Sequence, residues 1–203
     1  TLLSAQKVIV ACGAFSLAKG LLPQTLPMKV LARTVTFFEV GDVERKRLGG
    51  MPSVVYMPPD QSFDFYVLPP VRYPDGKFYI KIGGDPEDVE LANQSELRDW
   101  FKGCGDVDVG RFLRDQLLRM MPDLNYRSIS CGSCATSYTN TGKPLIYQQT
   151  ESGFALTGGN GAGAKCADEL GRLGAKLVLT GSIEDEGYET DFQPAPPSNQ
   201  ASG

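Results

Sequence analysis

A glycine-rich stretch between an apolar run and a helical pattern is the part of this sequence best suited to chemistry. Residues 154–157, FALT, predict a short buried strand, and GGNGAG at residues 158–163 follows directly. From Lys165 onward, polar and apolar residues recur with helical period. A strand, a glycine turn and a helix N-terminus together present backbone N–H groups that suit an anion or the polar edge of a ring.

Lys165 stands in the first turn of this predicted helix. A cation there opposes the helix dipole, at a cost of about 0.3–1 kcal/mol. It is either a solvated surface lysine or a residue that faces a ligand carboxylate or a cofactor, and the local pattern leaves both interpretations open. Gly171 and Gly174 fall on the predicted buried face and cost about 1 kcal/mol each relative to alanine. We therefore expect this helix to lie very close to a sheet.

Side chains that commonly bind metals or act as nucleophiles are sparse. The sequence has five cysteines and no histidine, so Ser-His and Cys-His triads are excluded within it, and no metal site is predicted. The residues that follow Cys131-Gly-Ser-Cys134, at 136–140, predict a strand, whereas a thioredoxin-like redox pair begins a helix. The odd, scattered cysteines favour reduced thiols in an intracellular protein, with the cytoplasm, mitochondrion and peroxisome all left open.

Composition and charge are those of an ordinary globular chain. Hydrophobic residues make up 41% and charged residues 22% of the 203 residues. No apolar run reaches the roughly 18–20 residues of a membrane span. The net charge is −4, but the acidic excess lies in residues 183–203 and the rest is nearly neutral. We expect neither a membrane span nor a nucleic-acid partner.

The remaining elements are mostly strands before residue 82 and helices soon after it. Predicted strands cover residues 7–13 (buried on both faces, as in a parallel sheet), 28–40, 54–57, 63–68, 78–82, 129–140 and 145–147. Predicted helices cover residues 95–102 and 109–121, with a short helical or turn segment at 16–22 and a polar loop at 41–50. The strands at 63–68 and 78–82 flank a Pro-Asp-Gly turn and are expected to form a hairpin.

This order of elements predicts an antiparallel sheet with flanking helices at residues 23–135. That sheet is inserted between two pieces of an α/β domain, residues 1–22 and 136–182, and residues 183–203 are expected to be a disordered acidic and proline-rich tail. Gly159-x-Gly161-x-x-Ala164 formally matches the dinucleotide fingerprint, but no second strand and acidic residue follow it. We interpret the turn as a ligand-facing loop of a site built mostly by other residues.

Several stretches, in this order, resemble the C-terminal half of the FAD-dependent D-amino-acid oxidase/sarcosine oxidase superfamily. The closest branch is that of the sarcosine, N-methyltryptophan and pipecolate oxidases. The resemblance covers about residues 1–180 and is carried by KVIVACGAFS at 7–16, VLARTVTFFE at 30–39 with Arg33, FYVLP at 65–69, YIKIG at 79–83, YTNT at 138–141 and GGNGAGAK at 158–165.

The resemblance implies a fold and a set of roles. The fold class is α/β, with an antiparallel substrate-binding domain inserted into the C-terminal pieces of a Rossmann-like FAD-binding domain. Lys81 would lie above the flavin and activate O₂ through its charge, Tyr66 would contact the substrate, and Lys165 would pair with the substrate carboxylate. Cofactor contacts would come from the strand turn and the glycine loop, at Gly13, Gly159, Asn160, Gly161, Ala162 and Gly163.

Departures from the family pattern also carry information. Covalent-flavin members have a cysteine two residues before the tyrosine of the Tyr-Thr-x-Thr segment, and this chain has Thr136 there. We therefore predict non-covalent FAD. Asp85 and Ala162 replace family histidines near the hairpin and in the glycine loop, so the substrate is left open.

The sequence thus predicts the C-terminal part of an FAD-dependent oxidoreductase. It would oxidise the C–N bond of an amino or imino acid by hydride transfer to flavin, with O₂ or another acceptor taking the electrons. Because Thr1 stands where Met would begin a chain and the GxGxxG half is missing, we expect a fragment that binds FAD poorly by itself. The alternative is a non-catalytic module that binds a carboxylate or a protein partner.

Overall fold

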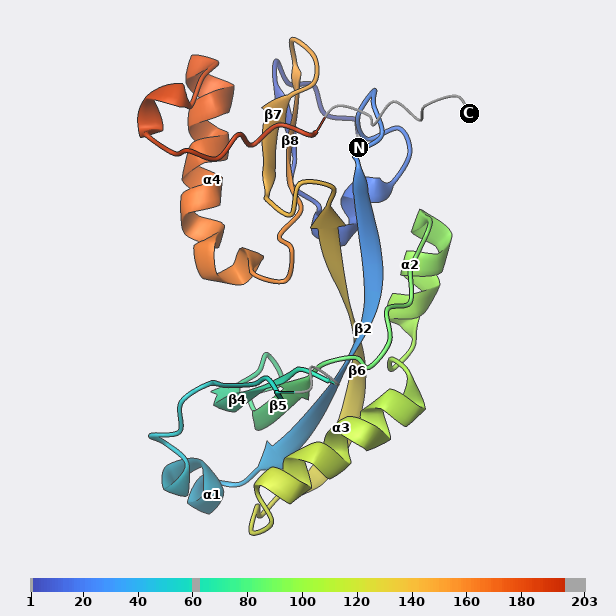
Figure 1. Cartoon of the computed structure of the whole chain (residues 1–203), viewed down its shortest axis with the longest axis vertical. Coiled ribbons are helices and arrows are strands. Elements are labelled where there is room, and N and C mark those ends of the chain that lie inside the picture. The colour runs from blue at the N-terminus through green and yellow to red at the C-terminus, as the bar shows by residue number, and fades with distance from the viewer. Residues whose placement is uncertain (1, 60–62, 196–203) are drawn as a thin grey trace. The chain divides into compact units, whose positions relative to one another are not determined.

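The computed structural model describes residues 2–59 and 63–195, and these form two compact units (Figure 1). The first unit consists of Thr1–Leu31, Leu91–Leu97 and Thr136–Gly203, and the second of Ala32–Glu90 and Arg98–Ala135. Residues 23–31 and 91–97, which we predicted within the inserted domain, thus group with the first unit. None of the helices within the described residues is long and apolar enough to cross a lipid bilayer.

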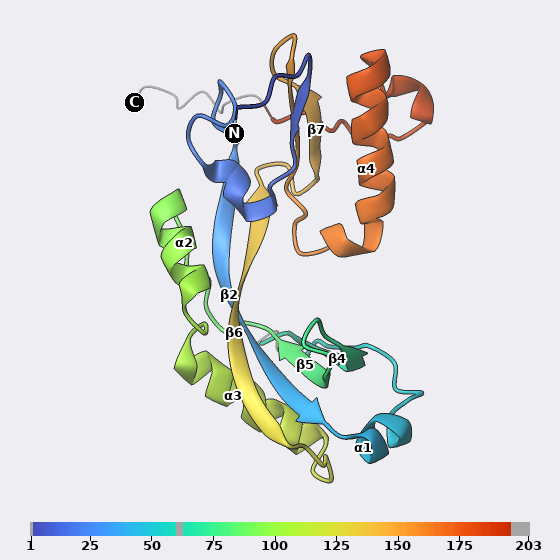
Figure 2. The same ribbon diagram turned by 180° about the vertical axis from the view of Figure 1, so that it is seen from behind.

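The first unit is built on a three-stranded sheet in the order β1 (Val8–Val10), β8 (Gly153–Thr157), β7 (Leu145–Gln148). β1 runs parallel to β8, and β7 runs antiparallel to it. Helix α4 (Gly163–Thr180) lies along this sheet (Figure 2) and buries Leu173 and Leu177 against it. The predicted strand at 154–157, the glycine turn and the following helix are therefore confirmed.

The prediction that the first strand is buried on both faces is wrong. Val8 is 53% exposed and Ile9 is 38% exposed, while Val10 is buried. β1 is the edge strand of the three described strands, so only part of its surface meets the rest of the unit. The short 3₁₀-helix η1 (Gly13–Leu17) follows it.

Gly171 and Gly174 of α4 lie in different surroundings. A Cβ on Gly174 would lie 2.7 Å from Leu156 Cδ1 and 3.2 Å from Ile9 Cδ1, so glycine there permits the close approach of helix and sheet that we predicted. Gly171 is exposed, and a Cβ there would meet no atom within 4 Å. Its predicted burial is wrong, because the helix contacts the sheet along a narrower stripe than the sequence pattern indicated.

Gly171→Ala is expected to stabilise the chain by about 0.5–1 kcal/mol, because alanine restricts the unfolded chain and favours the helix without a clash. The measurement is the free energy of unfolding from urea titration. Gly181→Ala is the matched control: Gly181 ends α4 with φ +84°, so alanine there is strained and should destabilise. A loss of stability in Gly171→Ala would mean that this side of α4 is covered.

The second unit contains most of a five-stranded sheet in the order β3-β4-β5-β2-β6. The strands are β2 (Met28–Val40), β3 (Val54–Tyr56), β4 (Phe65–Arg72), β5 (Phe78–Gly83) and β6 (Ser128–Thr139). Three pairs of neighbouring strands are antiparallel: β2 with β5, β5 with β4, and β4 with β3. The predicted antiparallel sheet and its hairpin are confirmed.

Two helices accompany this sheet in sequence, α2 (Gln94–Lys102) and α3 (Val107–Met120), each within two residues of its predicted start. Leu113 and Leu117 of α3 are fully buried in a core with Phe38, Ile80 and Ile82 of the sheet. The Asp106 carboxylate caps α3 by accepting the N–H groups of residues 108 and 109. The core therefore occupies one face of the sheet and leaves the other face free of α3.

Two local predictions in this unit are wrong. Residues 41–50 were expected to be a loop, but α1 (Asp42–Arg47) forms there because the buried Glu44 carboxylate pairs with Arg47 and accepts the Asn125 N–H at 3.2 Å. β4 was expected to stop before Pro69, yet it continues through both prolines. A register shift between Leu68 and Val71 takes the prolines out of the regular ladder, where they lack a donor.

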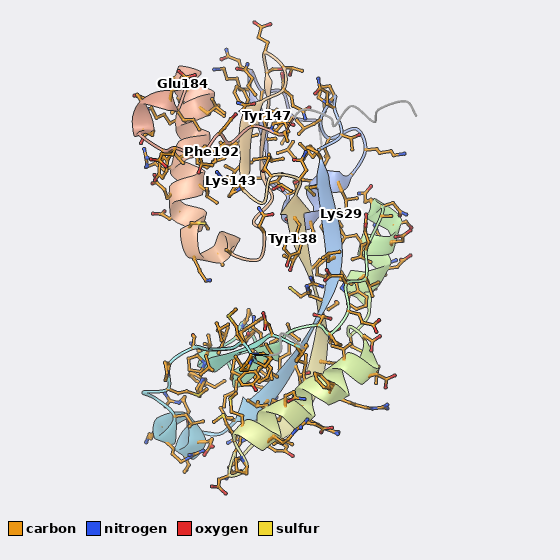
Figure 3. All side chains as sticks on the ribbon, viewed as in Figure 1. Lys29, Tyr138, Lys143, Tyr147, Glu184 and Phe192 are labelled. Carbon is orange, nitrogen blue, oxygen red and sulfur yellow. The ribbon has the colours of Figure 1, made fainter. Side chains whose placement is uncertain are left out.

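The segment after α4 also differs from its prediction as disordered. Residues 184–186 form the 3₁₀-helix η2, and Glu186 pairs with Arg172 and, at 2.6 Å, with Lys176. The Phe192 carbonyl accepts the Ile146 N–H at 2.9 Å, and its ring packs on the core under α4 (Figure 3). Scattered apolar residues and complementary charges on α4 hold this segment. Residues 196–203 of the predicted tail lie outside the described residues.

Candidate functional site

The glycine loop of the first unit borders a cavity of about 260 Å³. It is lined by residues of the turn that follows β1, of β7 and β8, of the glycine loop and of α4: Ala11, Gly13, Pro144, Leu145, Ile146, Leu156, Thr157, Gly158, Gly159, Gly163, Ala167 and Leu170. Thr157 Oγ1 donates a 3.1 Å hydrogen bond to the Gly13 carbonyl and so ties the two turns together. The fold thus brings Gly13, Gly159 and Gly163, which are 150 residues apart at most, into one site.

The loop keeps its shape through left-handed residues and one asparagine. Gly158 and Gly161 have φ of +76° and +74°, and Asn160 has φ +47°, a conformation that asparagine tolerates. Asn160 Oδ1 accepts the Thr139 N–H at 2.9 Å, and the Asn160 N–H donates to the Ser137 carbonyl at the same distance. Asn160 therefore fastens the loop to β6.

These bonds divide the predicted cofactor residues into two groups. Gly13, Gly159 and Gly163 line the cavity, whereas Asn160, Gly161 and Ala162 are not among its lining residues. The N–H groups of Asn160 and Ala162 are already bonded within the chain, the latter to the Gly159 carbonyl at 2.8 Å. Their backbone contacts with a cofactor stay a prediction.

The Tyr-Thr-x-Thr segment supports the loop from β6 and the turn after it. Thr139 Oγ1 donates to the Lys143 carbonyl at 2.7 Å. Figure 3 labels Lys143 and also Tyr138, the residue before Thr139. A Cβ on Gly161 would lie 3.6 Å from the Tyr138 hydroxyl and 3.8 Å from Thr136 Cγ2. Thr136 thus stands beside the glycine loop.

Lys165 is exposed in the first turn of α4 and does not line the cavity. Its backbone N–H donates to the Ala162 carbonyl at 3.1 Å. None of the ion pairs between described residues involves its side chain. A solvated lysine and a lysine that binds a carboxylate both fit these facts.

Lys81 and Tyr66 lie together in the second unit, on the sheet face opposite α3. Lys81 stands between Phe37 of β2 and Leu68 of β4, and Tyr66 is opposite Gly83, two residues along the same face. The Lys81 ammonium lies 5.3 Å from the centre of the Tyr66 ring, within the range of a cation–π interaction. Both side chains are partly buried, so this face carries a positive charge next to an aromatic ring.

Three further rings extend this face. Phe37, Tyr73 and Tyr79 contact one another edge to face, with centroids 5.3–6.0 Å apart. The sequence analysis did not single them out, although strict alternation in YIKIG already placed Tyr79 on the same face as Lys81. We call the surface formed by these residues the open face: Phe37, Tyr66, Tyr73, Tyr79 and Lys81.

Tyr66 is held as a neutral phenol. Burial, followed by the neighbouring Cys134, Tyr73 and Asp85, raises the pKa of Tyr66 to about 12. Its ring fills the space where a Cβ on Gly83 would be, 2.6 Å from the hydroxyl oxygen. Tyr66 is therefore a hydrogen-bond donor or an aromatic contact and not a base.

Asp85 is bonded to the backbone where the β2–β5 ladder ends. Both of its carboxylate oxygens accept the Thr34 N–H at 3.1 Å. Burial raises the pKa of Asp85 to about 6, opposed by the Thr34 bond and by Arg33 and reinforced by Asp106 and Asp88. Arg33 pairs with Asp88 at 2.7 Å. Asp85 thus caps a strand, a role that its sequence position did not reveal.

Stability is expected to fall as pH rises through the titration of Asp85. The folded-state pKa of about 6 exceeds the ordinary value of 3.8, so the folded chain binds more protons between these values and loses stability as they leave. Relative to Asp85→Asn, the wild type should lose on the order of 1 kcal/mol from about pH 4 to pH 7, after discounting for the partly solvated position. Urea titrations of both chains across this range measure it, and parallel curves would contradict it.

The two cysteines of the C-x-x-C motif lie on opposite faces of the sheet. Cys131 faces α3, where its Sγ lies 3.8 Å from a Cβ built on Gly110. Cys134 is three residues further along β6 and therefore on the opposite face, where it acts on the pKa of Tyr66. The two thiols of this motif do not face each other.

A comparison with protein-family models decides the family. Residues 1–177 match the model of the FAD dependent oxidoreductases (DAO). The chain belongs to the DAO family. This agrees with the mixed α/β fold and its antiparallel sheet, and it confirms the resemblance that the sequence showed. No curated protein matched the chain.

Solved structures of DAO-family fold resemble the chain at low sequence identity. A modified fructosyl peptide oxidase from Aspergillus nidulans gives a TM-score of 0.72 at 15% identity, covering 98% of this chain and 47% of that one. Amadoriase I from Aspergillus fumigatus, a fructosyl amine:oxygen oxidoreductase, gives 0.59 at 18%, covering 86% and 40%. Iminodiacetate oxidase from Chelativorans sp. BNC1 gives 0.58 at 16%, covering 95% and 47%. The chain therefore spans less than half the length of these proteins.

Proposed function

We propose that this chain is the C-terminal part of an FAD-dependent oxidase of N-substituted amino acids, such as sarcosine, other N-methyl amino acids or pipecolate. When bound, FAD accepts a hydride from the carbon next to the substrate amine and passes the electrons to O₂ or another acceptor. The observation that carries the proposal is the Lys81 ammonium over the Tyr66 ring on the open face. The names of the similar proteins, iminodiacetate oxidase and fructosyl amine:oxygen oxidoreductase, support an amine substrate and O₂.

In this proposal residues 1–22 and 136–182 complete an FAD-binding domain, and residues 23–135 form the substrate-binding domain. The separate hydrophobic cores of the two compact units support such a division. Residues 23–31 and 91–97 would serve as the connections, since they group with the first unit.

The glycine cavity fits the edge of a flavin ring. A Cβ on Gly13 or Gly163 would meet no atom of the chain within 4 Å, and Gly163 has no left-handed φ. None of the contacts among the described residues therefore requires glycine at position 163, whereas a ligand that approaches the backbone would require it. The N-terminus of α4 beside it favours negative charge, which is what a reduced flavin ring carries.

The chain's charged side chains would bind and polarise. Lys165 would pair with the substrate carboxylate, Tyr66 would contact the substrate with its ring, and the ammonium of Lys81 would stabilise the negative charge formed as O₂ is reduced. Thr136 beside the glycine loop offers no thiol for a covalent link, so we propose that FAD is held non-covalently.

Lys165→Met in the full-length protein is the experiment for substrate binding. Losing one charged hydrogen bond costs about 1.5–3 kcal/mol, so KM for a carboxylated amine should rise about 10- to 100-fold, with a smaller effect on kcat. Lys143→Met removes an exposed lysine of the same unit and should leave KM unchanged. If Lys165→Met oxidises the substrate with an unchanged KM, Lys165 does not bind the substrate. If the unaltered full-length protein oxidises no N-substituted amino acid, the proposed function itself is wrong.

A further inference from the structure

Cys104 and Cys131 meet in the second unit, although they are far apart in sequence. Cys104 lies in the loop between α2 and α3, and residues on either side of it contact β6 next to Cys131. Ser133 Oγ donates to the Gly103 carbonyl at 3.3 Å, and a Cβ on Gly105 would lie 3.1 Å from the Gly132 carbonyl oxygen. These two contacts place Cys104 beside the stretch of β6 that carries Cys131, and the Cys104 thiol acts on the pKa of the Cys131 thiol.

The two thiols differ in accessibility. Cys104 is exposed, and Cys131 is partly buried under α3, against Gly110. Burial, and then the adjacent Cys104 thiol, raise the pKa of Cys131, which favours the protonated form of this thiol. The Cys104 thiol is exposed to solvent. An oxidant from solvent therefore reaches Cys104 first.

We propose that Cys104 and Cys131 form a peroxide-sensitive disulfide. The Cys104 thiolate attacks a hydroperoxide, an S–O bond forms as the O–O bond breaks, and hydroxide leaves to take up the thiol proton as water. Cys131 then attacks the sulfur of this sulfenic acid, the S–S bond forms, and the S–O bond breaks with loss of a second water. The two thiols are oxidised by two electrons and the hydroperoxide is reduced.

This disulfide would tie the loop that leads into α3 to the back of β6. The other face of β6 carries Gly132, where a Cβ would lie 3.1 Å from the Phe37 ring, and Cys134 near Tyr66. The modification site is thus behind the open face, and it goes beyond the proposed function because it needs neither flavin nor substrate. The partner of Cys131 is Cys104 and not Cys134, the residue that the sequence motif suggests.

The test treats the reduced chain with a small excess of hydrogen peroxide, alkylates remaining thiols and maps tryptic peptides without reductant. No Lys or Arg lies between Cys131 and Cys134, so both fall in one tryptic peptide, 128–165, which continues past Lys143 because a proline follows that lysine. The mapping is therefore done in Cys134→Ser. We expect this peptide to be linked to peptide 103–111 in most molecules and to be released by dithiothreitol. Alkylation of both Cys104 and Cys131 after peroxide would overturn the proposal.

Single variants separate the roles of the two thiols. Cys104→Ser should leave Cys131 alkylated, and Cys131→Ser should trap Cys104 as a sulfenic acid that dimedone labels. Cys131→Ala repeats the second arm in case serine is not tolerated at this partly buried position. A Cys131–Cys134 link in the wild type, or dimedone labelling of Cys131 in Cys104→Ser, would contradict the proposed order.

Discussion

Replacing Lys81 by methionine is expected to slow reoxidation of the reduced flavin by O₂ about 100- to 1,000-fold in the full-length protein. Methionine keeps the length and apolar stem of lysine but removes the ammonium, which lies 5.3 Å from the Tyr66 ring centre. The loss should appear in stopped-flow reoxidation, because the role proposed for the charge is to stabilise O₂ as it gains electrons. Reduction of the flavin by substrate should change much less.

Two variants frame this result. Lys46→Met removes an exposed lysine of α1 in the same unit and should leave reoxidation unchanged. Lys81→Arg keeps the positive charge on the open face and should restore part of the rate. If O₂ reacts equally fast with Lys81→Met, Lys81 does not activate oxygen and the parent protein is better described as a dehydrogenase.

Gly158→Ala is expected to destabilise the chain by about 3 kcal/mol, because alanine there adds both backbone strain and a steric clash. Gly158 has φ +76°, and its Cβ would lie 2.2 Å from Thr139 Cγ2. Thr139 cannot move aside without losing hydrogen bonds, since its Oγ1 donates to the Lys143 carbonyl and its N–H donates to Asn160 Oδ1. The free energy of unfolding from urea titration measures the effect.

Gly142→Ala separates strain from collision. Gly142 has φ +68° but open space around it, so alanine there should cost only about 1 kcal/mol. Thr139→Ser removes the colliding methyl group and keeps the hydroxyl, so it should recover much of the stability lost in Gly158→Ala. Equal losses in Gly158→Ala and Gly142→Ala would show that the loop is not pressed against Thr139.

The sequence was most informative where one periodic pattern was long. Residues 28–40 predicted β2 at its observed bounds, because thirteen residues rich in β-branched and aromatic side chains outweigh any local ambiguity. The glycine loop was also predictable, since a strand, glycines and a helix pattern follow each other without interruption. The proximity of Gly13 to this loop came from the family resemblance and not from any local signal.

Contacts between distant residues account for most of what was missed. α1 depends on Glu44 and the Asn125 N–H, and the segment at 183–192 depends on charges of α4. The strand cap by Asp85 and the meeting of Cys104 with Cys131 likewise join residues far apart in sequence. Their short motifs are polar or irregular, so periodicity carries no information about them.

The most direct test of the account is the anaerobic spectrum of the full-length protein with candidate substrates. We predict an oxidised-flavin absorbance band that disappears when sarcosine, pipecolate, a fructosyl amino acid or iminodiacetate is added. Acid precipitation of the protein should release the flavin into the supernatant. The fructosyl amino acid and iminodiacetate test the chemistry named for the similar structures. A protein that purifies without flavin, or whose flavin no N-substituted amino acid reduces, would contradict the central claim.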